Sequence, residues 1–576
     1  MRAIGFSSAA RKLTSPRLPA PGPARIGPGH PLGGVPTDTS RRAPPRAIFD
    51  NVSNNGRFAV PDTEVAIIGA GLSGIGMAIA LQRAGIGDFV VLERAGDIGG
   101  TWRDNVYPGV GVDVPAQAYQ FSFALNPRWS RVFAPGAEVK EYLDGLADRY
   151  GVRRHVRLDT EVTERIWDEG GRFWRLRTPA GELTARFVVS AIGAFVDPKP
   201  ADIPGIDDFT GTVLRSSAWD PGCDLTGKRV AVIGTGASAV QIVPEIARRA
   251  ARLDVYQRTP IWVGPKLDAP IPRPLRRLFR RAPRVQEAVR RIATRGVEMV
   301  LIDLVVGHGR APWIAHGGAR LARSVWYRTQ VRDPETRRRL TPRYGLGCKR
   351  PSVSNTYLRT FNRPGVSLIT DAIDRVTPAG VRTAGGHERE VDAIVLATGF
   401  RLASDPEVFR RTPVRGRDGF DLATFYTEHR LASYEGISIP GLPNHFMMFG
   451  PYGWVGGTWH QLVETTSAHV VRVIQEARRR GATAVEVRPE PTERWTNRMR
   501  DRLAGSLWAT NGCATANSYY FDHHGDTPYL RPTSAAQAAR AARTFPLDDY
   551  AYTVPETTAL GDPASSASPA SETRPA

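Results

Sequence analysis

Cysteine is scarce in this sequence. Its 576 residues include three, Cys223, Cys348 and Cys513, which lie far apart and form no CxxC or CxxH spacing. The sequence therefore suggests neither a disulfide framework nor a zinc site. A reducing cytosol is the compartment that this usage favours, so we expect a cytoplasmic protein.

Long apolar runs are also missing. The longest, such as residues 297–307, contain acidic side chains and are far shorter than the roughly 20 apolar residues that span a bilayer. No apolar stretch follows the first arginines, so we expect no secretory signal. The sequence therefore predicts no integral membrane contact.

Acidic residues are too few to balance the basic ones, and the formal net charge is +20. Residues 1–60 and 266–345 together carry this excess, so the rest of the chain is close to neutral. No nucleic-acid motif and no basic groove interleaved with aromatic residues accompanies the charge, so we expect no nucleic-acid binding.

The two ends of the chain have a biased composition. Residues 1–58 form a basic, Pro/Gly-rich tail without an apolar period, and residues 553–576 have a similar bias, so we expect both to be disordered. A transit peptide and an over-long start are alternatives for the first tail. Ordered structure is expected from about Thr63 to about Tyr552.

Two segments share one pattern, an apolar run that leads into a glycine turn and then into a helical period. They are residues 63–85 and 228–250. Each predicts a strand–turn–helix unit of the kind that binds a dinucleotide. We therefore predict an α/β fold with two Rossmann-like domains.

The first unit matches the pattern G-x-G-x-x-G at Gly69, Gly71 and Gly74. One glycine makes the tight turn, one lets the backbone approach a pyrophosphate, and one packs the helix on the strand. Glu93 ends the next apolar run, where a carboxylate can accept hydrogen bonds from ribose hydroxyls. These features predict a dinucleotide site, which we assign to FAD.

The second unit has Gly234, Gly236 and Ala239 at the corresponding positions. Arg258 and Thr259 stand at the end of its next strand, where an acid would favour an unphosphorylated ribose. A cation and a hydroxyl suit a 2′-phosphate, so this site is expected to prefer NADPH over NADH. A surface arginine without a ligand is the alternative for Arg258.

Two further apolar runs, 186–195 and 391–400, indicate where the chain leaves the first sheet and returns to it. We therefore predict domains that are discontinuous in sequence. They are an FAD-binding domain at 59–198 and 391–552, and an NADPH-binding domain at 199–265 and 346–390 with a helical insertion at 266–345.

The stretches between the turns are more specific. Residues 99–123 resemble the flavin-proximal segment of type I Baeyer–Villiger monooxygenases, which are class B flavoprotein monooxygenases, and residues 257–263 and 347–366 also resemble that family. Residues 209–220 resemble the fingerprint F-x-G-x-x-x-H-x-x-x-W of that family. The resemblance covers roughly residues 63–550.

Two departures from the family pattern stand out. The fingerprint histidine is Arg215 here, which puts the coupling of domain movement to catalysis, or the substrate range, in doubt. A C-terminal loop that usually carries Ser-Trp-Tyr reads Ser518, Tyr519 and Tyr520. Tyr519 can still stack on and hydrogen-bond a nucleotide, so we expect a retained role with altered affinity.

The resemblance implies an NADPH- and O₂-dependent flavin monooxygenase. Such enzymes form a C4a-peroxyflavin that inserts one oxygen atom next to the carbonyl of a lipophilic ketone and gives an ester or lactone. N- or S-oxygenation of a soft nucleophile is the alternative, which the missing fingerprint histidine makes more plausible. A flavin disulfide reductase would need a redox CxxC, which the sequence lacks.

The resemblance also assigns roles to residues. Arg350 matches the active-site arginine, a donor that stays charged when it is desolvated. Asp113 matches the aspartate that orients this arginine and contacts the nicotinamide side of the cofactor; an ordinary loop cap is the alternative. Lys349 is expected to reach the 2′-phosphate together with Arg258 and Thr259.

Further cofactor contacts follow from the same match. For FAD they are Ser73, Thr101, Trp102, Asp104, Tyr119, Val162 on an expected edge strand, and His460 at the start of a helix. For NADPH they are Thr235, Ala237, Ser238, Gln241 and Tyr519. A structural role is the alternative for His460. No metal site is expected.

The insertion at 266–345 has helical apolar spacing and a basic face. Solvated charge is the main reading, and loose association with an anionic membrane is an alternative. The identity of the substrate and the oligomeric state stay open.

Overall fold

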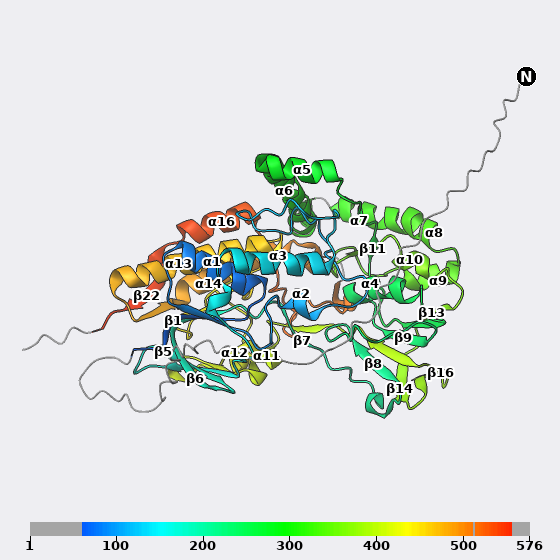
Figure 1. Cartoon of the computed structure of the whole chain (residues 1–576), viewed down its shortest axis with the longest axis horizontal. Coiled ribbons are helices and arrows are strands. Elements are labelled where there is room, and N and C mark those ends of the chain that lie inside the picture. Colours follow the sequence, from blue (N-terminus) through cyan, green and yellow to red (C-terminus); the bar gives the residue numbers. More distant parts are fainter. Residues whose placement is uncertain (1–59, 311, 511–512, 556–576) are drawn as a thin grey trace, which may run out of the picture. The chain divides into compact units, whose positions relative to one another are not determined.

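The computed structural model describes residues 60–310, 312–510 and 513–555 (Figure 1). The expected tail at 1–58 and nearly all of the tail at 553–576 lie outside the described residues. No helix among the described residues is long and apolar enough to cross a bilayer.

The first sheet contains eight strands in the order β19-β4-β5-β6-β1-β2-β3, with β20 also paired to β6. These are β1 (Thr63–Ile68), β2 (Phe89–Leu92), β3 (Val156–Arg157), β4 (Glu164–Asp168), β5 (Phe173–Thr178), β6 (Gly181–Ser190), β19 (Val414–Arg415) and β20 (His445–Met447). Strands β3, β2, β1, β6 and β20 are parallel. The interior of β1 is almost wholly apolar because helices and loops cover both faces of a parallel sheet.

Three helices cover one face of this sheet. They are α1 (Leu72–Arg83), α3 (Gly136–Arg149) and α13 (Trp459–Arg480), and α1 packs against both others (Figure 1). Helix α13 ends at Gly481, whose positive φ closes the helix in the left-handed conformation. The short helix α2 (Thr101–Asp104) follows β2.

The second sheet is fully parallel, with five strands in the order β13-β10-β9-β17-β8. The strands are β8 (Thr212–Arg215), β9 (Arg229–Ile233), β10 (Arg252–Tyr256), β13 (Val366–Ile369) and β17 (Ala393–Leu396). Helix α4 (Ala237–Ile246) follows β9. The central strand β9 therefore places its glycine turn at the carboxyl edge of a buried sheet, where dinucleotides bind in such folds.

The predicted return to the first sheet at residue 391 is wrong. Strand β17 pairs with β8 and β9 and belongs to the second sheet. The crossing lies further on, where β7 (Phe195–Pro198) and β18 (Phe400–Leu402) form an antiparallel pair. A wholly buried apolar strand fits either sheet, so its composition did not tell which one it joins.

A helical segment separates β11 (Val263–Gly264) from β12 (Ser352–Val353), which pair in parallel. It contains α5 (Arg273–Arg281), α6 (Pro283–Glu298), α7 (Pro312–Leu321), α8 (Tyr327–Gln330) and α9 (Pro334–Leu340). In Figure 1 these helices, coloured green, lie along one edge of the molecule. They occupy the range in which the sequence predicts a helical insertion.

The chain also forms shorter helices and strands between and after these elements. They are α10 (Tyr357–Thr360), β14 (Ile373–Thr377), β15 (Gly380–Thr383), β16 (Glu388–Glu390), α11 (Pro406–Arg411), α12 (Leu422–Glu428), β21 (Ala484–Val487), α14 (Pro489–Ala504), α15 (Leu507–Thr510), α16 (Ala535–Thr544) and β22 (Tyr550–Thr553). Strands β14, β15 and β16 form a small antiparallel sheet beside the second domain.

A disulfide joins Cys348 to Cys513, whereas Cys223 is free. The sequence did not suggest this bond, because its partners are 165 residues apart and proximity of that kind arises only in the tertiary fold. The expectation of a reducing compartment rested on cysteines that suggested no disulfide, so this bond removes its basis. The bond links the segment just before Lys349 to the C-terminal loop that carries Tyr519.

Candidate active site

A cavity of about 2160 Å³ lies between the two sheets and is lined by both glycine turns. The lining includes every residue that the sequence analysis assigned to catalysis or cofactor binding, except Gly74, Ala239 and His460. The volume is larger than the roughly 300–1,000 Å³ of a common small-molecule pocket. It therefore has room for more than one large ligand.

The two glycine turns are built alike. Gly69 and Gly234 both have positive φ, +105° and +116°. A Cβ at Gly69 would lie 2.8 Å from the carbonyl oxygen of Ala191, and a Cβ at Gly234 would lie 2.3 Å from that of Ala397. Both turns therefore require glycine for the same two reasons, the backbone conformation and the close neighbouring strand end.

Both helices after these turns begin without a side-chain cap. Gly71 and Gly236 are the N-cap residues of α1 and α4, and both have extended backbones. The first-turn amides are therefore available to an anion, and the helix dipole favours negative charge there. A pyrophosphate fits each of these two positions.

Glu93 is buried at the end of β2. Its carboxylate accepts hydrogen bonds from the backbone N–H of Ala70 at 2.8 Å and from that of Ala95 at 3.1 Å. It also forms an ion pair with Arg103 at 3.0 Å. These contacts hold the carboxylate at the pocket wall, within reach of a ribose.

The end of β10 has the opposite charge. Arg258 is exposed, and neither it nor Lys349 forms an ion pair within the described part of the chain. Burial and the nearby Arg258 lower the pKa of Lys349 to about 8. Thr259 lines the same wall and accepts a hydrogen bond through its carbonyl from the Thr235 hydroxyl. Unpaired cations in one corner of a pocket provide a site for an anion such as a 2′-phosphate.

Arg350 and Asp113 meet across 237 residues of sequence. The Nη2 atom of Arg350 donates to Oδ1 of Asp113 at 2.7 Å, and about a third of each side chain is exposed to the pocket. The negative charge of Asp113 raises the pKa of Arg350 well above its usual value. Arg350 therefore presents a fixed positive charge between the two turns.

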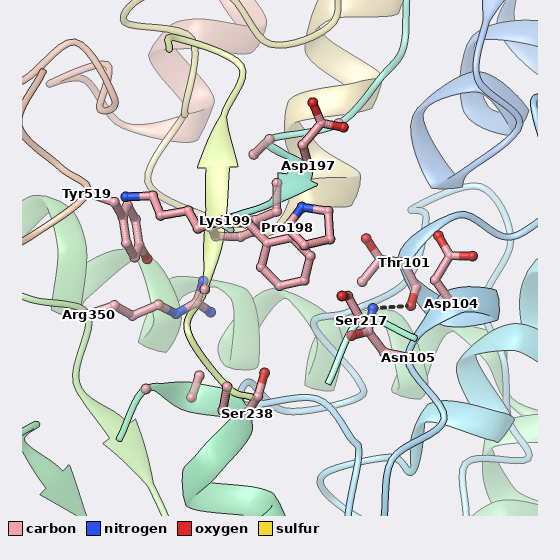
Figure 2. A pocket seen from close by; sticks show the side chains of 18 of the residues that line it. Thr101, Asp104, Asn105, Asp197, Pro198, Lys199, Ser217, Ser238, Arg350 and Tyr519 are labelled. Atoms are coloured by element: carbon pink, nitrogen blue, oxygen red, sulfur yellow. Dashed lines mark hydrogen bonds between the residues drawn. The ribbon is translucent and has the colours of Figure 1, made fainter. Parts of the chain in front are cut away.

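Tyrosines surround this arginine. Tyr519, Tyr520 and Tyr529 line the pocket, and Tyr520 packs against the other two. Figure 2 shows the side chains of Arg350 and Tyr519 pointing into the pocket. Burial raises the pKa of Tyr519, while the charge of Arg350 opposes the rise. Tyr529 carries no motif in the sequence, and Tyr520 stands out there only as a departure from the family motif.

The disulfide lies beside this cluster. Cys348 precedes Arg350 by two positions, and Cys513 precedes Tyr519 by six. The Trp508 indole also donates to the carbonyl of Gly347 at 3.0 Å. The arginine segment and the tyrosine loop are therefore held to one another by a covalent bond and a buried hydrogen bond.

The predicted FAD residues line the other end of the cavity. Ser73 accepts a hydrogen bond from the Trp459 indole at 2.7 Å, and the Trp102 indole donates to the Tyr119 hydroxyl at 3.2 Å. Asp104 pairs with Arg103. Figure 2 shows Thr101 and Asp104 on the same part of the wall, where the Asn105 side chain donates to the carbonyl of Thr101 at 2.8 Å.

A bridge of side chains connects the two nucleotide units. The Tyr107 hydroxyl donates to Gln241 on α4 at 3.0 Å, and the Gln241 amide donates to the carbonyl of Gly111 at 3.0 Å. Ser238, one turn away on the same helix, lines the pocket (Figure 2). Sequence reasoning assigned Gln241 but missed Tyr107, whose only signal was its position inside the segment 99–123.

Two predicted FAD residues are placed differently from expectation. The His460 side chain is fully buried against the rings of Tyr119, Phe121 and Tyr142, and it does not line the cavity. Burial lowers its pKa to about 3, so the ring is neutral. Val162 lines the pocket from the irregular segment between β3 and β4, where the backbone N–H groups of Thr160 and Thr163 donate to the carbonyls of Glu93 and Arg177.

The fingerprint segment has a packing role. Phe209 and Trp219 are buried, and a Cβ at Gly211 would lie 2.6 Å from the carbonyl oxygen of Asp392. Arg215, in place of the histidine, ends β8 and forms a backbone bridge to Ala218. Ser217, in the turn after it, lines the pocket (Figure 2).

Known proteins share this arrangement. A family model described as pyridine nucleotide-disulphide oxidoreductase matches residues 66–278. A Baeyer–Villiger monooxygenase of Streptomyces coelicolor is 38% identical over 515 residues, which cover 88% of this chain and 96% of the relative. A Baeyer–Villiger monooxygenase of Pseudomonas aeruginosa is 40% identical over 452 residues, which cover 78% and 84%.

Solved structures agree with these relatives. The NADP⁺-bound cyclohexanone monooxygenase from Rhodococcus sp. Phi1 superposes with a TM-score of 0.76 at 27% identity, over 86% of this chain and 99% of that one. The OTEMO complex with FAD and NADP superposes with a TM-score of 0.75 at 27% identity, over 86% and 100%. The last of these contains both kinds of dinucleotide in one fold.

Proposed function

Because this chain belongs to the family of Baeyer–Villiger monooxygenases, we propose that it oxidises a lipophilic ketone with O₂ and NADPH, using bound FAD. One oxygen atom enters next to the carbonyl and gives an ester or lactone, and the other leaves as water. NADPH and a proton supply the two electrons and the hydrogen that this balance needs. The flavin, when bound, supplies the transfer of those electrons to O₂.

The residues present fit the two cofactors. In each glycine turn another backbone segment lies so close to Gly69 or Gly234 that a Cβ atom would not fit. Each turn leads into a helix whose first amides have no side-chain cap. The buried carboxylate of Glu93 suits a ribose with free hydroxyls at the first turn. The cations Arg258 and Lys349 suit a 2′-phosphate at the second turn.

The Arg350–Asp113 pair is the observation that carries the proposal. When oxygen attacks a carbonyl, negative charge develops on oxygen, and a donor already in place stabilises that charge without reorganising. Arg350 can serve because its hydrogen bond and ion pair with Asp113 keep the guanidinium protonated and hold it in one orientation. The tyrosine rings around it reduce its contact with water, which strengthens the interaction.

The test separates reduction of the cofactor from transfer of oxygen. In Arg350→Ala, anaerobic NADPH is expected to bleach the flavin absorbance as in the parent. Ester formation from a cyclic ketone, measured by mass spectrometry, is expected to fall by about 10²-fold or more. The exposed Arg343 provides the matched control, since Arg343→Ala removes a charge from the same segment outside the pocket lining.

Three outcomes would contradict the proposal at different points. An unchanged ester yield in Arg350→Ala would refute the role of that residue. Purified protein that is colourless and gains no flavin absorbance with added FAD would refute the enzyme. Sulfoxide from a thioether, with no ester from any ketone, would replace the reaction with S-oxygenation.

A further inference from the structure

Helix α6 carries a row of large apolar residues on its outside. Val285, Ile292 and Met299 recur every seven residues, which is about two helical turns, so they lie along one face. Their exposed fractions are 41%, 74% and 53%. The exposed row continues where the helix passes into a π-helical turn at Met299–Asp303.

The buried face of the same helix is polar. Gln286, Thr294 and Glu298 are its buried residues. The Gln286 amide donates to Gln117 and to the carbonyl of Asn126, and Glu298 accepts from the backbone of Ala535. A surface helix ordinarily turns its apolar stripe to the core, so this reversed pattern indicates that the outer stripe meets an apolar partner.

Two further helices of the insertion also expose large apolar side chains. Leu275 and Leu278 on α5 are exposed, and on α7 the exposed fraction of Trp313 is 72%. Figure 1 shows α5, α6 and α7 along the same edge of the molecule. We call this surface the insertion face and define it by Leu275, Leu278, Val285, Ile292, Met299 and Trp313.

Unpaired arginines border the insertion face. Arg273, Arg277, Arg280, Arg281 and Arg284 are exposed, and none of them forms an ion pair with another described residue. This charge opposes the pairing of two copies through the same face, because the arginines of both would be brought together. It favours an apolar partner with a negatively charged surface.

The flank of α6 beside the exposed row reaches the active site. Ala293, Gly296, Val297 and Val300, at its C-terminal end and in the turn after it, line the cavity. One helix therefore lines the cavity with one flank and exposes the apolar row beside that flank. A lipophilic molecule that leaves an apolar phase at the insertion face would meet the cavity wall next.

We propose that the insertion face binds the surface of an anionic phospholipid bilayer. Its apolar side chains enter the boundary between head groups and acyl chains, and the bordering arginines contact the lipid phosphates. The lipid-dissolved substrate then enters beside α6. Only this last step rests on the proposed function; binding of the bilayer does not.

The test measures binding of the full-length protein to vesicles by co-sedimentation. Binding is expected with vesicles of phosphatidylcholine mixed with phosphatidylglycerol, weaker binding with phosphatidylcholine alone, and loss at high salt. The triple variant Arg280→Glu, Arg281→Glu, Arg284→Glu is expected to bind at least about tenfold more weakly. Ile292→Asn is expected to weaken binding while keeping the charge.

Matched controls use exposed residues on other elements. Arg494, Arg498 and Arg502 are spaced along an exposed face of α14 and form no ion pair with a described residue. Their triple change to Glu makes the same change in net charge and is expected to bind vesicles like the parent. Leu158→Asn controls for Ile292→Asn, and thermal unfolding shows that each variant is folded.

Several outcomes would overturn the proposal. Equal binding of the parent and the Arg280/Arg281/Arg284 variant would place membrane contact elsewhere, for instance on the basic residues before 60. A dimer that Ile292→Asn dissociates would make the insertion face an interface between copies. Absence of ester product with intact vesicle binding would refute the proposed reaction and leave the membrane surface standing.

Discussion

The turn after β1 and the turn after β9 have the same backbone but different surroundings. Most of α1 is buried, including Ser73, and the Trp459 indole closes the turn from above. At the second turn, Gly236 and Ala237 are exposed. An enclosed site suits a cofactor that stays bound between reactions, and an open site suits one that is exchanged.

The charged groups at the ends of β2 and β10 show the same contrast between an enclosed site and an open one. Glu93 is buried and already bonded, so it is ready to accept ribose hydroxyls. Arg258 and Lys349 are unpaired within the described residues, and burial disfavours the charged form of Lys349. The first site is therefore preorganised, whereas the second becomes electrostatically complete only when an anion enters.

The largest effect is expected from the third position of the turns. A Cβ at Gly74 would lie 1.8 Å from the carbonyl oxygen of Gly69, whereas the second unit already has a Cβ at Ala239. Gly74→Ala should therefore abolish bound flavin, measured as the ratio of flavin to protein absorbance. Ala239→Gly should keep flavin and fold. A Gly74→Ala protein with the same ratio of flavin to protein as the parent would contradict this difference between the two turns.

The second effect concerns coenzyme choice. Arg258→Ala should raise the KM for NADPH by about 10- to 100-fold, since a hydrogen bond to a charged group is worth roughly 1.5–3 kcal/mol. The KM for NADH should change little. Arg249→Ala, an exposed change near the other end of α4, is the control. Equal rises for both coenzymes would show that Arg258 does not contact the 2′-phosphate.

The third effect concerns the disulfide that joins two segments of the cavity wall beside Arg350. The first turn is covered by non-covalent contacts, which include the hydrogen bond from Trp459 to Ser73, whereas the Arg350 segment is tied to the tyrosine loop by Cys348–Cys513. Cys513→Ser should reduce the free energy of unfolding by about 2–4 kcal/mol. Cys223→Ser should have little effect, and denaturant melts compare the two. Three reactive thiols in the unfolded, unreduced parent would show that no disulfide forms.

The smallest effect is a pH dependence confined to the second site. Lys349 has a pKa lowered to about 8, so it loses its positive charge as pH rises through that value. The KM for NADPH should then increase several-fold above about pH 8, because a neutral amine holds the 2′-phosphate less well. The KM for NADH should stay flat. Lys349→Arg should remove the trend, and a trend that survives in this variant would have another source.

The same Lys349 titration can be shifted through its neighbour. Arg258 contributes to the lowered pKa, so Arg258→Ala should move the midpoint to higher pH. A midpoint that moves down would contradict the proximity of the two cations. Bound phosphate should also move the midpoint upward, since an anion favours the protonated amine.

Local signals were enough to predict much of the site. Gly69, Gly234 and Glu93 could be assigned because a strand, a turn and a following strand end are set within about thirty residues. Arg258 was found by the same rule, because it stands at the strand end where an acid would favour an unphosphorylated ribose. Arg350 and Asp113 needed the family resemblance, because nothing local indicates that residues 237 apart will meet.

The errors share one cause. Strand β17 was assigned to the wrong sheet, and the Cys348–Cys513 bond was missed. Each depends on which distant segment a residue packs against, and composition does not record that. The reversed pattern of α6 is similar, because a polar inner face is visible only once its partners Gln117 and Ala535 are in place.

By itself, therefore, the sequence determined the α/β class, the two glycine turns and the sign of charge at each strand end, since these follow from backbone sterics and local spacing. Only the tertiary structure decided which strands share a sheet, which cysteines pair and which face of α6 is exposed. Those outcomes depend on the free energy of burying one distant surface against another, and no short window of sequence contains both surfaces.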